Sequence, residues 1–243
     1  MWLKITKNYS PNFNLSKRLK KKIKFIIIHY TGMKNENLAI KRLTDLKSKV
    51  SSHYFIKKNG DIIQFVPDLY EAWHAGKSSW GKFSSLNRYS IGVEIQNSGH
   101  DHGYESFSNK QINSLKILLK NLIKKYKINF RNVLGHSDIA PERKKDPGEK
   151  FPWEHLSKNK LALWHKLDKS KLKKYRLEKI SSKEEVQLLE NLYKLGYKRS
   201  KFSKLNIHKK NLLKAFQQRF RQSLVNGLMD KECFLICKNL IKS

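Results

Sequence analysis

The sequence predicts an α/β protein: a central mixed β-sheet flanked by helices, followed by a small three-helix domain. Apolar runs rich in β-branched residues, at 25–28 and 90–96, are typical of strands buried on both faces. Amphipathic helical patterns lie between and after these runs, and only helical patterns follow the lysine-rich stretch near residue 175. We therefore expect three parts: a larger domain at 1–167, a basic linker at 168–180 and a helical domain at 181–243.

The first predicted strand delivers a histidine to its end. Four apolar residues, Phe25 to Ile28, immediately precede His29, so the sheet would fix the backbone of this histidine. Leucines spaced among charges predict an amphipathic helix over 36–49. Asn59-Gly60 is the strongest short hairpin signal in the chain, and it joins two further strands, at 53–57 and 61–66.

The middle of the chain places a carboxylate inside an apolar strand. Glu94 lies between Val93 and Ile95, where a buried carboxylate is costly unless it is paired or bound to a metal. Because alternate side chains of a strand point to opposite faces, Glu94 can face a cleft while its neighbours face the core. Glu94 is therefore a stronger functional candidate than a surface glutamate. A buried salt bridge to a lysine is the structural alternative.

The remaining elements of the larger domain follow from caps and apolar spacing. Ser108 and Gln111 form a capping-box pattern at the start of a helix that runs to about residue 125. A short strand is expected at 132–134, and a helix that closes the domain is expected at 152–167. Two stretches rich in glycine or serine are interpreted as exposed loops, at 77–87 and 99–103.

The carboxyl-terminal part is predicted to hold three helices. Ser182 and Glu185 form a second capping-box pattern, and Gly196 is a suitable stop for the helix that follows. The other two helices are expected around 211–221 and from residue 230. Cys233 and Cys237 lie four positions apart in the last helix, and we interpret both as small core residues rather than as a disulfide framework.

A loop at 135–148 carries a candidate metal site. Pro141, Pro147 and Gly148 break regular structure here, and a loop held by its prolines can aim His136 and Asp146 at one point. Nitrogen and oxygen ligands suit zinc, and a catalytic zinc needs three protein ligands and an open position. His29 is the best candidate for the third ligand. Taken alone, each histidine is more often a surface or hydrogen-bonded residue, and Asp138 is a rival carboxylate.

Composition limits the other classes of function. The formal net charge is +32, a field that would attract nucleic acid, anionic lipid or an acidic polymer. The lysines are spread along the whole chain, whereas a phosphate-reading protein usually gathers arginine where recognition occurs. We therefore attribute the charge to solvated faces and expect no specific nucleic-acid partner.

Targeting signals are not evident in the sequence. Residues 1–22 contain no apolar run of signal-peptide length, and no stretch approaches the ~18 apolar residues of a membrane span. The sequence therefore predicts a cytoplasmic protein without a membrane span. Export to the periplasm or cell envelope by another route stays open, and the sequence does not indicate an oligomeric state.

Five separated segments closely resemble the zinc N-acetylmuramoyl-L-alanine amidases of the AmpD/AmiD type. They occur in that family's order and span about residues 23–156; they are His29-Tyr30-Thr31, Val50 to Tyr54, Ala72 to Gly76, Ser90 to Ile95 and Gly135 to Pro141. The resemblance implies that Zn²⁺ is held by His29, His136 and Asp146. It also implies that Glu94 and Lys144 are the catalytic pair.

The function implied by this resemblance is hydrolysis in cell-wall turnover or recycling. The bond cleaved would be the amide between N-acetylmuramic acid, or its anhydro form, and the L-alanine of the peptidoglycan stem peptide. Trp73, His74 and Ala75 would contact the substrate, since an aromatic face and a donor suit a sugar ring or a peptide. The basic surface would assist encounter with stem-peptide carboxylates.

Two alternatives accompany this interpretation. The same fold could recognise peptidoglycan without cleaving it, although a recognition protein would be free to lose the ligand set and Glu94. In the C-terminal part, Leu195-Gly196-Tyr197 and two later segments resemble a small three-helix peptidoglycan-binding domain. The threonine that often opens the second helix of that domain is missing, so a purely stabilising helical appendage is the alternative there.

Overall fold

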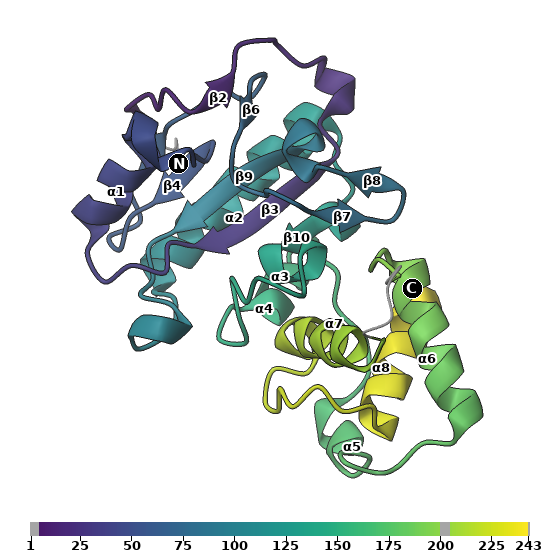
Figure 1. Cartoon of the computed structure of the whole chain (residues 1–243). Coiled ribbons are helices and arrows are strands. Elements are labelled where there is room, and N and C mark those ends of the chain that lie inside the picture. The colour runs from purple at the N-terminus through teal and green to yellow at the C-terminus, as the bar shows by residue number, and fades with distance from the viewer. Residues whose placement is uncertain (1–4, 200–204, 243) are drawn as a thin grey trace.

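The structure is a computed structural model that describes residues 5–199 and 205–242. Within them a six-stranded sheet forms the centre of the larger part (Figure 1). Its strands lie in the order β1 (Ile5–Lys7), β5 (Ile62–Gln64), β4 (Tyr54–Ile56), β9 (Ser90–Ile95), β3 (Phe25–Tyr30) and β10 (Val133–Gly135). Strands β4 and β5 are antiparallel, and the other neighbours are parallel. The predicted mixed sheet is therefore confirmed.

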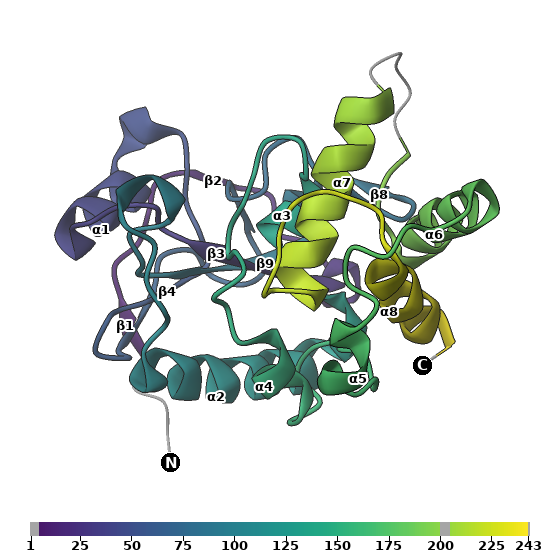
Figure 2. The ribbon, with the colours of Figure 1, turned by 90° about the horizontal axis from the view of Figure 1, so that it is seen from below.

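Helices cover both faces of this sheet. Helix α2 (Asn109–Tyr126) packs its apolar stripe, including Leu115 and Leu119, against one face (Figure 2). Helix α1 (Glu36–Thr44) packs Ala39 and Leu43 against the opposite face, beside Phe55 and Phe65. Helix α1 is shorter than the predicted helix at 36–49, and a separate 3₁₀ turn, Leu46–Ser48, follows it.

Strand alternation places two polar side chains on the same face of the sheet. In β3, Ile26 and Ile28 face the α2 core, so His29 points to the other side. In β9, Val93 and Ile95 face the same core, and Glu94 points away from it, as the sequence predicts. His29 and Glu94 are register partners on these neighbouring parallel strands. The two side chains therefore start from adjacent points at the carboxyl ends of β3 and β9.

The first predicted helix cap is confirmed, and the second is displaced by one residue. At the start of α2, Ser108 Oγ accepts from the Gln111 amide at 3.2 Å, and Gln111 Oε1 accepts from the Ser108 amide at 3.0 Å. Helix α6 (Ser182–Leu195) is capped by Ser181 and Glu184 rather than by Ser182 and Glu185. Because the sequence Ser-Ser-Lys-Glu-Glu holds two overlapping patterns of the same spacing, sequence alone could not choose between them.

The helix predicted at 152–167 is wrong beyond its first turn. Only α4 (Trp153–Ser157) forms, and Lys160 then adopts a left-handed conformation with φ of 55°. Leu161 and Ala162 belong to the core under the sheet, whereas Leu163 belongs to the C-terminal core. These apolar residues therefore join two cores along an irregular segment instead of forming one helical stripe.

Three helices pack together at the carboxyl end. They are α6, α7 (Leu205–Phe220) and α8 (Lys231–Lys242), and we refer to them as the C-terminal helices. Cys233 and Cys237 are free and buried in their core, as predicted. The segment expected to be a linker contains a short helix, α5 (Lys169–Lys173), and its Leu172 is buried in the same core.

Helix α7 of this group lies against the larger part at α3 (His136–Ile139), as both ribbon views show (Figures 1 and 2). The stretch at 77–87, expected to be an exposed loop, forms a hairpin of β7 (Ser79–Trp80) and β8 (Phe83–Ser84). Trp80 in this hairpin packs edge-on against Tyr197, with ring centroids 4.8 Å apart.

A second small sheet joins β2 (Phe13–Asn14) to β6 (Glu71–Ala72). The glycine-flanked stretch at 99–103, expected to be a solvated loop, contains a 3₁₀ turn at His100–His102. His100 does not face only solvent, because its Nε2 lies 3.0 Å from Glu149 Oε2. Among the described residues, no helix combines the length and apolar character needed to cross a membrane.

Candidate metal centre and active site

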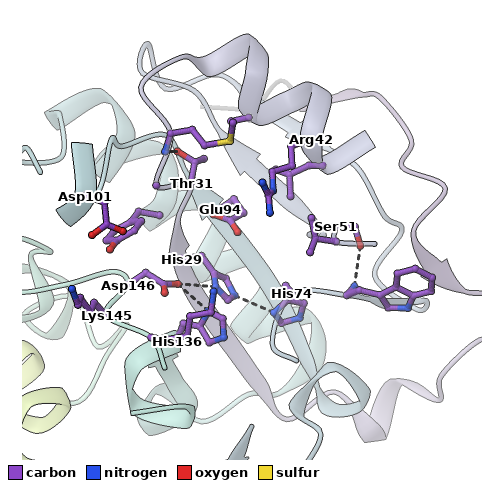
Figure 3. A pocket seen from close by; sticks show the side chains of 18 of the residues that line it. His29, Thr31, Arg42, Ser51, His74, Glu94, Asp101, His136, Lys145 and Asp146 are labelled. Carbon is purple, nitrogen blue, oxygen red and sulfur yellow. Dashed lines mark hydrogen bonds and ion pairs between the residues drawn. The ribbon is translucent and has the colours of Figure 1, made fainter. Parts of the chain in front are cut away.

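Three side chains distant in sequence converge at the carboxyl ends of β3 and β10. His29 Nδ1 lies 3.0 Å from His136 Nδ1 and 3.0 Å from Asp146 Oδ2, and His136 Nδ1 lies 3.1 Å from the same carboxylate oxygen (Figure 3). All three residues are buried. The rigid loop at 135–148 brings His136 and Asp146 together, and β3 supplies His29. Two nitrogens and one carboxylate oxygen aimed at one point match the donor set of a catalytic zinc.

Each histidine presents Nδ1 to this centre and uses Nε2 in a separate hydrogen bond. His29 Nε2 lies 3.0 Å from His74 Nδ1, and His136 Nε2 lies 3.2 Å from the Ala75 carbonyl oxygen. A carbonyl only accepts, so His136 carries its proton on Nε2 and leaves Nδ1 free to bind a cation. Histidine ligands of metals ordinarily donate their second N–H in this way, and the bond fixes tautomer and ring orientation.

His74 continues the hydrogen-bond chain into the protein. If His74 Nδ1 accepts from His29, its Nε2 is a donor, and Ser90 Oγ lies 3.3 Å away to receive it. Ser90 Oγ in turn donates to the Leu86 carbonyl at 2.6 Å. Each step has one donor and one acceptor. The residue that makes room for this ring is Gly92, where a Cβ would lie 2.5 Å from His74 Cγ.

Electrostatics keep two of the converging groups, His29 and Asp146, in the states that bind a cation. Burial lowers the pKa of His29 to about 4, and the nearby His136 adds to this effect. Burial alone would raise the pKa of Asp146, but its contacts with His136 and His29 hold this pKa well below its usual value. At neutral pH His29 is therefore neutral and Asp146 is ionised, which suits metal ligation.

Glu94 stands beside this centre, and one of its carboxylate oxygens lacks a hydrogen-bond partner among the described residues. It is half-buried, and within the described residues its Oε2 is out of contact with solvent and makes no hydrogen bond. Burial raises the pKa of the Glu94 carboxyl well above its usual value; the Asp146 charge adds to this, and Lys144 opposes it. In the part of the chain that the structure describes, no lysine forms the salt bridge with Glu94 that was the structural alternative. An orphaned carboxylate that faces a cavity is typical of a group that works on a bound molecule.

These groups open into a cavity of about 630 Å³. Its walls include His29, Glu94, His136, Lys144 and Asp146 (Figure 3 shows most of them as sticks). Lys144 is exposed on the loop between the two ligand positions, and its charge acts on both His29 and Glu94. The cavity is large enough for a sugar or peptide fragment.

The residues expected to contact substrate divide into two groups. Trp73 lies on the cavity wall, half-exposed, with Nε1 donating to Asn14 Oδ1 at 3.0 Å. His74 differs from the expected free donor, because both of its ring nitrogens are engaged by His29 and Ser90. The Ala75 side chain is fully buried, and its carbonyl serves His136. Asp138, the rival carboxylate, lies outside the converging group and is paired with Arg219 instead.

Other residues support the loop although no sequence signal pointed to them. Arg143 Nη2 donates to the Ala75 carbonyl, and its Nε donates to the Lys77 carbonyl at 3.0 Å. The Tyr30 hydroxyl lies 2.8 Å from His100 Nδ1, and His100 Nε2 lies 3.0 Å from Glu149. These contacts join positions far apart in the chain, and ordinary residue types make them, so spacing could not reveal them.

Comparison with known proteins places this chain in a family. Residues 19–149 match the family described as N-acetylmuramoyl-L-alanine amidase. The N-acetylmuramoyl-L-alanine amidase AmiD of Escherichia coli (strain K12) is 35% identical over 235 residues, which is 91% of this chain and 83% of that protein.

Solved structures give the same result for the fold. A complex of E. coli AmiD with anhydro-N-acetylmuramic acid-L-Ala-D-γ-Glu-L-Lys superposes with a TM-score of 0.80 at 33% identity, over 94% of this chain and 91% of that one. AmpDH3 of Pseudomonas aeruginosa with anhydromuramic pentapeptide gives 0.80 at 31% identity, over 96% of each chain. The chain belongs to the family of N-acetylmuramoyl-L-alanine amidases, and it is an enzyme of this type.

Proposed function

We propose that this amidase is zinc-dependent and hydrolyses the amide bond between N-acetylmuramic acid, or its anhydro form, and the L-alanine of the stem peptide. The observation that carries the proposal is the convergence of His29, His136 and Asp146 within 3.1 Å of one another, beside an orphaned Glu94. The relatives bound to anhydromuramic peptides support this choice of substrate. A role in cell-wall turnover or recycling follows from the same chemistry.

The residues fit a zinc ion by their donor set. His29 and His136 offer nitrogens whose rings are held by second hydrogen bonds, and Asp146 offers an ionised oxygen. A zinc ion bound there supplies Lewis acidity to a carbonyl oxygen and lowers the pKa of water. The cavity on the open side leaves room for water and substrate next to these ligands.

Glu94 and Lys144 are proposed to handle the proton and the developing charge. Glu94 carries a carboxylate oxygen with no competing donor, so it can accept a proton from the attacking water and pass it to the departing nitrogen. Lys144, exposed on the cavity wall, would stabilise negative charge on the carbonyl oxygen. Trp73 would offer its ring face to the sugar or peptide.

The catalytic unit is proposed to be residues 1–167, since the sheet, the converging ligands and Glu94 all lie there. Residues 181–243 are proposed to form a separate three-helix domain that is similar to the small peptidoglycan-binding domain.

The decisive experiment is mass spectrometry of products from zinc-loaded protein, with anhydro-muropeptides and with intact peptidoglycan as separate substrates. Release of free stem peptide that begins with L-alanine supports the proposal, and its loss on zinc removal ties it to the metal. His29→Ala and Asp146→Ala should lose zinc and activity together. Zinc-loaded protein that binds muropeptide and leaves it intact would indicate recognition without cleavage.

A further inference from the structure

The carboxylate of Asp138 lies at a buried contact between the C-terminal helices and the loop at 136–149. We call residues 136–149 the metal loop, because it carries His136, Lys144 and Asp146. The Tyr197 hydroxyl donates to Asp138 Oδ1 at 2.6 Å, and Arg219 Nη1 donates to Oδ2 at 2.5 Å. Asp138, Tyr197 and Arg219 are each only 2% exposed. The ion pair is therefore withdrawn from water on both sides.

Arg219 joins the two ends of the segment that holds His136. Its Nη2 donates to the Val133 carbonyl of β10 at 3.0 Å, while Nη1 binds Asp138 on α3. Asp138 Oδ2 also accepts from the Gly135 amide at 2.8 Å. A planar guanidinium has donors in fixed directions, so two such bonds set the spacing between strand end and helix. His136 lies between these two anchor points.

The orientation of Arg219 is fixed by packing as well. Its guanidinium lies 4.5 Å from the centre of the Trp153 ring and 4.9 Å from that of Phe220. Stacking on two aromatic rings restricts the rotation of the group about its long side chain. The two hydrogen bonds to β10 and α3 are therefore made from a pre-set position.

Further contacts follow the metal loop past its other functional residues. His208 Nδ1 on α7 lies 2.8 Å from Glu142 Oε1, and Gln218 hydrogen-bonds Glu149. Just after α7, Gln222 donates to the Phe151 carbonyl at 2.6 Å. Lys144 and Asp146 lie between these contacts in the sequence. Helix α7 and the segment just after it therefore contact the chain at Glu142, Glu149 and Phe151, and Figures 1 and 2 show α7 beside α3 at the start of the loop.

We propose that the C-terminal helices position the metal loop, with Arg219 and Tyr197 as positioning residues that set the geometry of His136 and Asp146. This inference rests on the proposed function, since it takes the loop to bind zinc. A buried ion pair is a weak source of stability because both charges are desolvated, yet its directional bonds select one arrangement of the backbone. Groups that orient metal ligands from outside typically control metal affinity.

The test compares three conservative variants of the full-length protein. Arg219→Lys keeps the charge, but a lysine ammonium cannot donate to Val133 and Asp138 in the two fixed directions of a guanidinium. Tyr197→Phe removes one hydroxyl while keeping the ring. Arg221→Lys is the matched control: Arg221 is also buried and ion-paired, with Asp230 and Glu232. These partners, together with Leu224 and Asn226, all belong to the C-terminal region.

Zinc affinity is measured by competition with a chromophoric chelator, well below the unfolding temperature of each apo-protein. We expect Arg219→Lys and Tyr197→Phe to bind zinc about tenfold more weakly, the lower end for groups that orient ligands. Arg221→Lys should lower the unfolding temperature and leave zinc affinity unchanged. The visible spectrum of the cobalt-substituted protein should shift in the first two variants and stay constant in the control.

The outcomes separate this inference from the proposed function. If the unmodified protein fails to bind zinc, the proposed function is wrong. If it binds zinc and Tyr197→Phe and Arg219→Lys bind it equally well, only the positioning role is overturned. An equal loss of affinity in Arg221→Lys would also overturn it, because the effect would then come from general destabilisation. Should Arg219→Lys not fold, the milder Tyr197→Phe still decides.

Discussion

His29 Nε2 and His74 Nδ1 lie 3.0 Å apart, so the imidazole of a proposed zinc ligand is oriented by a second imidazole. The next residue, Ala75, accepts from His136 with its carbonyl. Two consecutive residues therefore orient both ligand histidines. His74 and Ala75 belong to the segment 72–76, whose resemblance implied contact with the substrate. At these two positions the segment forms the hydrogen bonds that orient the histidines of the proposed metal site.

A first prediction follows for His74. In His74→Asn the side-chain oxygen takes the place of Nδ1 and can still accept from His29, whereas His74→Leu leaves that N–H without a partner. We expect His74→Leu to weaken zinc binding by about 10- to 100-fold, and His74→Asn to recover most of the loss. Chelator competition measures both. Equal zinc affinity in the leucine variant and the unmodified protein would rule out the orienting role.

Gly92 gives a second prediction because it borders the same ring. A methyl group there would lie 2.5 Å from His74 Cγ, so Gly92→Ala must displace the imidazole or the backbone of β9. We expect a loss of stability of about 1–3 kcal/mol from overpacking, measured by urea unfolding of the apo-protein.

The double variant tests the cause of that loss. If Gly92→Ala acts on zinc binding through His74, its effect on zinc affinity should largely disappear in the His74→Leu background, since residues in contact are not additive. Additive losses of affinity would instead indicate that the methyl group perturbs Glu94 or β3 directly.

A third prediction concerns Glu94. Glu94→Gln keeps the shape of the side chain and removes its capacity to accept a proton. Because His29, His136 and Asp146 are untouched, zinc content should stay the same, while kcat should fall by at least about 100-fold if Glu94 is the general base. Metal analysis and turnover of an anhydro-muropeptide are the two measurements. A variant with full zinc and full turnover would assign the proton transfer to another group.

The strands that hold the site could be predicted because burial on both faces leaves an unambiguous apolar pattern. Phe25 to Ile28 and the apolar neighbours of Glu94 define β3 and β9, and alternation alone fixed the direction of Glu94. That His29 lies close to the loop at 135–148 is a prediction from the chemistry of metal ligands and from the family resemblance. The structure shows the convergence directly.

The supporting contacts could not be predicted, for a physical reason. His74 and Trp73 are neighbours in a short, irregular segment, so no period tells which side chain turns inwards. Arg219 and Asp138 are ordinary charged residues on separate elements, and only tertiary packing brings them into contact. The helix expected at 152–167 was wrong for a related reason: the apolar residues of this segment pack into two different cores, so their spacing does not reflect one helical face.

Buried histidines give the last prediction, on stability against pH. Burial lowers the pKa of His53 to about 3, with Arg18 adding to the effect, and it lowers the pKa of His165 to about 4, with Lys169 adding. Their ordinary value is 6.5, which the unfolded chain adopts. Below that pH these histidines bind protons in the unfolded chain but stay neutral in the folded protein. Stability is therefore fully present above pH 6.5 and is lost as pH falls towards these lowered pKa values.

Urea unfolding of the apo-protein between pH 8 and pH 4 tests this sign. The free energy of unfolding should be level from pH 8 to about 7 and should then fall by up to about 1.4 kcal/mol per pH unit for each such histidine. His165→Gln should make the decrease in the free energy of unfolding less steep, because one of the histidines that is protonated only in the unfolded chain has been removed. His102→Gln, at an exposed position, is the control and should leave the slope unchanged. A stability that rises as the pH is lowered through 6 would contradict the burial of neutral imidazoles, since only folded-state proton uptake produces that slope.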